Sequence, residues 1–180
     1  GSVFNVVGEV NGMYSDKTEV SERLARTPEA NTRTLNQSED EYNFEIGVDY
    51  DMALGAGRLK LLGLHRFESS PTEDRTRIAA VNGDLEGSVF QRQADEAESI
   101  VRAEFAFTAL DSQWRWSLEG TENYLDIDSQ LDSLDAQGAL SPVDFDGASA
   151  RVEETRAEST LNVSKQLNEQ VTLQATLGAE

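Results

Sequence analysis

Apolar and polar residues alternate over much of the chain, and the longest such run covers residues 41–54. Its even positions are apolar, whereas its odd positions are mostly acidic or amide side chains. The apolar positions are Tyr42, Phe44, Ile46, Val48, Tyr50, Met52 and Leu54. Because successive side chains of an extended chain point to opposite faces, this period predicts a β-strand with one apolar and one polar face.

A hairpin is predicted where this run ends. Gly55 and Gly57 interrupt the alternation, and residues 58–68 resume an apolar-rich extended run. Glycine tolerates the positive φ that tight turns require, so the two runs are expected to pair as an antiparallel hairpin. A strand of about 12 residues spans roughly 40 Å, against the usual mode of about 5–6 residues, and this length argues against a small sandwich.

The same alternation recurs in five further segments. With the hairpin they predict seven strands, near residues 3–14, 41–54, 58–68, 99–110, 114–125, 151–164 and 171–179. The intervening segments 15–40, 69–98 and 127–149 are rich in charged, Asn, Ser, Gly and Pro residues, which is the composition of loops. Short turns are expected at 55–57, 111–113 and 165–169.

Long and short connections therefore alternate along the chain. In an antiparallel meander this places all short turns at one end of the sheet and all long loops at the other. Short periplasmic turns and long extracellular loops are typical of outer-membrane barrels. The predicted fold class is all-β: an antiparallel meander of about seven long strands that is part of a larger transmembrane β-barrel. Residues 1–180 are accordingly expected to be one partial barrel domain.

A soluble β-sandwich or lipocalin-like barrel, used for binding or adhesion, remains the alternative because it shows the same alternation. Two features favour the membrane. Aromatic residues lie near the predicted short turns and near the opposite strand ends, as interfacial girdles do: Trp114, Trp116, Phe107 and Tyr50, then Tyr42 and Phe44. The apolar faces of 41–54 and 99–110 also carry no charge.

Composition excludes several functions. The chain carries 34 acidic and 15 basic residues, a formal charge of −19, which repels phosphate backbones and excludes nucleic acid as a partner. The absence of cysteine excludes disulfides and thiolate metal sites. No apolar run is long enough for a membrane-spanning helix. No cofactor is expected.

No catalytic or metal-binding motif is present. His65 is the one histidine, and an ordinary strand side chain accounts for it better than a Ser-His-Asp triad does. The aspartates of 126–146 lack the spacing, turn glycine and distal glutamate of an EF-hand loop. Mixed charges on the polar strand faces remain as candidate ligand-binding residues lining a lumen: Glu45, Asp49, Arg102, Glu104, Arg115, Glu119, Arg156 and Glu158.

Several strand-and-turn blocks resemble the barrel of TonB-dependent outer-membrane receptors. They are EDEYNFEIGVDYDMALGAGRLKLLGLHRFE, QADEAESIVRAEFAF, WSLEGTENYLD and ARVEETRAESTLNVSKQLNEQVTLQATLGAE, which cover residues 39–180 better than 1–38. The family combines a barrel of about 22 strands with an N-terminal plug and a TonB box, neither of which can be matched here. The resemblance implies a bacterial outer-membrane location, and lipid, TonB through other parts of the parent chain, and a small nutrient or metal chelate such as a ferric siderophore as partners.

Overall fold

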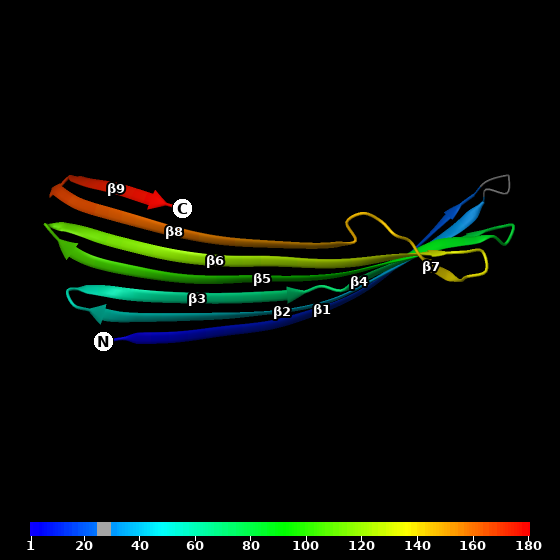
Figure 1. Ribbon diagram of the computed structural model, residues 1–180, viewed down its shortest axis with the longest axis horizontal. Coiled ribbons are helices and arrows are strands. Elements are labelled where there is room, and N and C mark those ends of the chain that lie inside the picture. The colour runs from blue at the N-terminus through cyan, green and yellow to red at the C-terminus, as the bar shows by residue number, and fades with distance from the viewer. Residues whose placement is uncertain (25–29) are drawn as a thin grey trace.

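The computed structural model describes residues 1–24 and 30–180, and the strands in these residues form one antiparallel sheet (Figure 1). The strands are β1 (Val3–Arg23), β2 (Asn31–Leu54), β3 (Gly57–Ser69), β4 (Thr72–Ala80), β5 (Leu85–Ala109), β6 (Ser112–Leu134), β7 (Leu140–Pro142), β8 (Ser149–Asn168) and β9 (Val171–Ala179). Across the sheet the order is β1-β2-β3-β5-β6-β8-β9. The predicted all-β antiparallel meander of long strands is confirmed.

Strands β3 and β4 run end to end and together occupy one position in the sheet. Both pair with β2 on one side and with β5 on the other. Pro71, which has no backbone N–H, separates them. Its carbonyl oxygen still accepts a hydrogen bond from Asp40 N at 3.1 Å, and Ser70 N donates to Ala94 O at 2.8 Å. The meander therefore continues through this break.

Two of the segments expected as loops are largely strand instead. β1 continues to Arg23 and β2 begins at Asn31, so most of 15–40 is paired, while residues 25–29 lie outside the described part. In 69–98, β4 pairs with β5, and only residues 70–71 and the turn at 81–84 are not strand. These strands carry polar side chains on both faces, so their sequence lacks the apolar–polar alternation from which strands were predicted. Cross-strand polar pairs support them, such as Thr18 with Asn36 at 3.0 Å.

The third expected loop, 127–149, is also shorter than predicted. β6 continues to Leu134, and β7 folds back antiparallel onto it. Residues 135–139 form the turn between them, where the Asp135 carboxylate accepts hydrogen bonds from Gln137 N at 2.9 Å and Ala139 N at 2.8 Å. Of this segment only 135–139 and 143–148 are not strand.

The three short turns have two residues each, at 55–56, 110–111 and 169–170, and are tighter than predicted. Residue 57, residues 112–113 and residues 165–168 belong to strands. Gly55 has a φ of 60°, and Leu110 and Asp111 have φ values of 53° and 54°. Positive φ at both central residues is the type I′ geometry, whose twist matches that of the flanking strands. Leu110 and Asp111 adopt this geometry although neither is glycine, so no glycine in the sequence marks the position of this turn.

The sheet is a single elongated layer with its short turns at one end and three projecting hairpins at the other (Figure 1). β1 and β9 are its two edge strands. Val89 and Ala94 are the buried hydrophobic residues of the described part, so no core of the usual kind forms there. No helix in the described residues is both long and apolar enough to cross a membrane. Both faces of the sheet are thus available for contacts.

Gly87 marks a position where two strands approach too closely for any side chain. A Cβ built on Gly87 would overlap the carbonyl oxygen of Thr76 in β4. We expect Gly87→Ala to destabilise the β4–β5 hairpin by about 1–3 kcal/mol, as overpacking does. Faster proteolysis at residues 81–84 would report it. Gly120→Ala is the control, because nothing lies within 4 Å of its Cβ position; equal protease resistance of both variants would contradict the prediction.

Candidate functional site: the polar face of the sheet

Strand pairing aligns the alternating residues into two continuous faces. The apolar face carries Phe44 and Val48 of β2, and the polar face carries Glu45 and Asp49 of the same strand. Aromatic side chains contact each other along the apolar face: Phe105 stacks on Phe107 at 5.4 Å between ring centroids, and Phe107 stacks on Trp114 at 6.3 Å. Although these rings touch, the face is open, and Val101 is 67% exposed.

The apolar face ends at a charged residue on each of five strands, towards the hairpin tips. These residues are Asp16 of β1, Asp40 of β2, Asp95 of β5, Glu122 of β6 and Glu153 of β8. Beyond this border the same face is mostly polar, although Val20, Val89 and Tyr124 also lie on it. Arg151, just outside it, donates to Glu153 at 2.8 Å, and this hydrogen bond is the main reason that the pKa of Arg151 is raised.

The border slopes across the sheet. Asp16 pairs with Ser38 of β2, whereas Glu153 lies in the row of Phe44, six positions nearer the short turns. Two residues depart from the slope: Glu73 of β4 also pairs with Ser38, and Glu122 of β6 lies in the row of Ile46, two positions nearer the short turns than Glu153. A shift of six residues is roughly 20 Å along the strands, over five strand spacings of about 24 Å. The apolar belt therefore crosses the strands at a slope of about 40°, within the range of about 35–45° by which strands tilt in transmembrane barrels.

Three of the predicted site residues meet on the polar face. Arg102 Nε lies 3.3 Å from Glu104 Oε1 and 3.6 Å from Glu119 Oε2. The two carboxylates are mostly shielded from solvent, with 25% and 24% of their side chains exposed. Glu158 pairs with Glu119 in the register and adds a further carboxylate beside it. This cluster carries a net negative charge and holds one guanidinium in place.

The other predicted residues are dispersed over the same face. Asp49 accepts hydrogen bonds from Asn5 Nδ2 at 3.1 and 3.2 Å. Glu45 pairs in the register with Glu9 on one side and Arg66 on the other. Arg156 lies 4.0 Å from Glu180. Arg115 lies near the short turns, away from the Arg102 cluster. The eight residues thus share a face but do not form one site.

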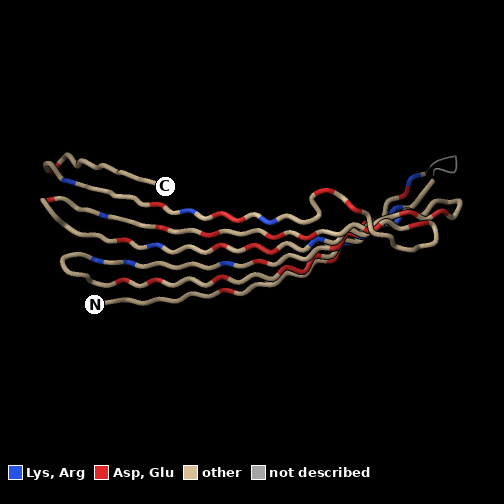
Figure 2. The backbone as a smooth tube through the Cα atoms, in the orientation of Figure 1, with Lys and Arg blue, Asp and Glu red and all other residues tan. Residues whose placement is uncertain are grey.

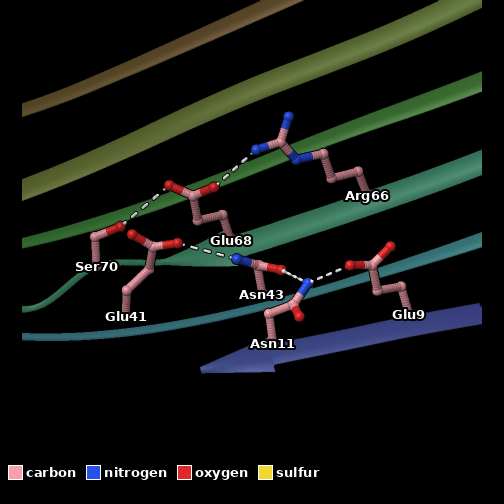
Figure 3. A network of polar contacts seen from close by, with 7 residues as sticks. All are labelled: Glu9, Asn11, Glu41, Asn43, Arg66, Glu68 and Ser70. Carbon is pink, nitrogen blue, oxygen red and sulfur yellow. Dashed lines mark hydrogen bonds and ion pairs between the residues drawn. The ribbon is translucent and has the colours of Figure 1, made fainter. Parts of the chain in front are cut away.

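Sequence reasoning missed a polar network on β1 and β2, at one edge of this face (Figure 3). Asn11 Nδ2 donates to Glu9 at 2.9 Å and to Asn43 Oδ1 at 3.3 Å, and Asn43 Nδ2 donates to Glu41 at 2.9 Å. These are contacts between residues two apart on a strand or directly paired across strands. The i, i+2 spacing of polar residues was the available signal, but the pairing of Asn11 with Asn43 depends on the register.

Carboxylates dominate the neighbouring rows of the polar face. Acidic residues are spread along the strands and outnumber basic ones (Figure 2). A groove of about 380 Å³ has four glutamates and one arginine in its lining: Glu68, Glu96, Glu98, Glu154 and Arg66. Arg66 Nη2 donates to Glu68 at 2.9 Å (Figure 3). The electrostatic potential in this groove is therefore negative.

His65 lies on the apolar face and not on the polar one. Its Nδ1 is 2.9 Å from Ser99 Oγ, and its ring lies 5.6 Å from that of Phe44. Glu122 is in the same row, but Ser99 lies between it and His65. In a Ser-His-Asp triad the carboxylate is hydrogen-bonded to the histidine, so these three residues are not arranged as a triad. In the described residues no group of three or more His, Asp or Glu side chains could share a metal ion.

Comparison with known proteins gives distant similarities in backbone shape. No family model matches the chain, and no curated protein matches it. The unliganded ferric citrate transporter FecA is similar over 96% of this chain and 24% of its own length, with 12% identity and a TM-score of 0.48. The translocator domain of the autotransporter NalP from Neisseria meningitidis is 11% identical over 98% of this chain and 64% of its own, with a TM-score of 0.30.

The ferric preacinetobactin receptor BauA of Acinetobacter baumannii is also similar, with 9% identity and a TM-score of 0.23 over 98% of this chain and 43% of its own. This chain spans about a quarter of the length of FecA.

Proposed function

We propose that the chain forms part of the wall of a transmembrane β-barrel in a bacterial outer membrane. The sloping apolar belt carries this proposal, because a flat apolar layer crossed by strands tilted by about 40° would require such a border. The apolar face would contact lipid, and the polar face would line a water-filled lumen. The placement of all short turns at one end is consistent with this orientation.

Within that class, we propose a nutrient-import receptor of the TonB-dependent kind, with a ferric siderophore as an example of its solute. The resemblance of the strand-and-turn blocks supports this narrower proposal. The polar face would then contact the solute during passage, and the Arg102, Glu104 and Glu119 cluster offers both signs of charge to it. TonB would be engaged by segments outside residues 1–180.

The orientation predicts where a protease will cut intact cells that display the parent protein. If the hairpins project from the cell, proteinase should cleave at residues 81–84, 135–139 and 143–147, which are irregular and exposed, and spare the turns at 55–56, 110–111 and 169–170. Paired strands resist cleavage, so 15–23 and 72–80 should also survive. Cells with a permeabilised outer membrane are the control. Cleavage of intact cells at the short turns alone would reject this topology.

A further inference from the structure

A hollow on the polar face, beside the short turns, differs in charge from the rest of the molecule. It has a volume of about 590 Å³, and its lining holds Arg58 and Arg115 but neither Asp nor Glu. Four other hollows in the described residues each contain at least two carboxylates. Since acidic residues outnumber basic ones by 34 to 15 in the chain, a positively charged hollow needs a specific explanation.

The register places the two arginines on either side of a small residue. Arg58 of β3 and Arg115 of β6 both pair with Ala106 of β5. Their Cα atoms are thus two strand spacings apart, about 10 Å. The methyl group of Ala106 leaves the space between the two side chains open. Arg58 and Arg115 therefore border this space from opposite sides.

The charge of Arg115 is not compensated by an ion pair with the described residues, whereas that of Arg58 is partly compensated. Arg58 donates from Nη2 and Nε to Asp51 Oδ1 at 2.6 and 3.0 Å, towards β2 and so on the side away from Ala106. Asp51 is not part of the lining. An arginine carries five N–H donors, so Arg58 keeps donors for a second acceptor.

Neutral donors complete the hollow. Asn162 pairs with Arg115, and Thr176 Oγ1 donates to Asn162 Oδ1 at 2.6 Å. This hydrogen bond occupies the amide oxygen, so the Nδ2 group of Asn162 remains a donor. Gln113 and Gln174 add side-chain amides to the lining. The group that best satisfies two guanidiniums and an amide N–H is an oxyanion.

We propose that the pocket formed by Arg58, Ala106, Arg115 and Asn162 binds a small organic anion through a carboxylate or phosphate group. The oxyanion lies above Ala106, between the two guanidiniums, and accepts hydrogen bonds from both. The volume is sufficient for a small metabolite. This site stands on the geometry of the hollow and does not depend on the transport proposal.

Calorimetric titration of the full-length protein in detergent, at low salt, tests the site with glutarate, inorganic phosphate and the neutral diamide glutaramide. Binding of either anion, with glutaramide about ten-fold weaker or more, is the expected result, because each charged hydrogen bond contributes enough for such a factor. The two anions distinguish carboxylate from phosphate as the preferred group. No binding of either anion, or equal binding of the diamide, would overturn the proposal.

Variants locate the binding. Arg115→Gln removes the charge, and Ala106→Leu fills the space without changing the charge; each should weaken anion binding about ten-fold or more. Arg75→Gln is the matched control: Arg75 is on β4, on the face of the sheet opposite the pocket, and this variant should bind the anion as the parent protein does. Heat-modifiable migration in gels verifies that all variants fold. Unchanged binding by folded Arg115→Gln or by folded Ala106→Leu would place the anion elsewhere and reject this pocket.

Discussion

Val48→Arg is expected to destabilise the membrane-inserted protein by about 2–4 kcal/mol, the cost of an arginine at the midplane on the lipid face of a barrel. Val48 lies halfway along the apolar run of β2 and pairs with Val6 and Gly63. At this position the guanidinium would either lose its contact with water or deform the bilayer. Phe44→Arg and Phe105→Arg, nearer the ends of the apolar face, should destabilise the protein less, because the penalty falls towards the interfaces.

Glu45→Arg is the matched control, three residues away on the polar face of the same strand. It has Glu9 and Arg66 as register neighbours, so one favourable and one unfavourable charge pair result. We expect its effect to stay within about 1 kcal/mol, as for surface charge pairs. Urea unfolding in lipid vesicles, followed by heat-modifiable migration, measures both variants. Similar destabilisation by the two would show that Val48 does not face lipid.

The strand segments that form the apolar face could be predicted from sequence, because a face that is buried against lipid or a core requires an apolar residue at every second position. The run at 41–54 lies within β2 and the run at 99–110 within β5, apart from its last residue. The projecting hairpins escaped prediction because water on both sides removes that period. Their strands are held by backbone pairing and by polar contacts, such as Gln37 with Asp74 at 3.0 Å.

Contacts within a hairpin were easier to anticipate than contacts between distant segments. Arg102 meets Glu119 because the turn at 110–111 fixes the register of β5 with β6. In contrast, Arg58 and Arg115 flank Ala106 only through the pairing of β3 with β5, which are joined by a long excursion through β4. A change of register by two residues would keep both faces but put these arginines opposite other residues, and the alternation in the sequence does not exclude it.

The isolated 180-residue chain is expected to aggregate in buffer without detergent. Its apolar face would meet water, with Trp116 49%, Val101 67% and Leu177 72% exposed, together with the aromatic cluster of Phe105 and Phe107. Soluble monomers rarely expose contiguous apolar patches larger than a few hundred Å². The long edge strand β1 adds a row of unpaired N–H and C=O groups, which is a template for pairing with other chains.

Sedimentation velocity of the chain, with and without detergent, measures this directly. In micelles the apolar face is covered, so we expect dispersed particles of uniform size, whereas in plain buffer most of the protein should sediment as large species. The net charge of −19 opposes association at low ionic strength, so added salt should increase the aggregated fraction. A compact monomer in plain buffer, with a cooperative thermal transition, would contradict the lipid-facing assignment of the apolar face and support a soluble β-domain.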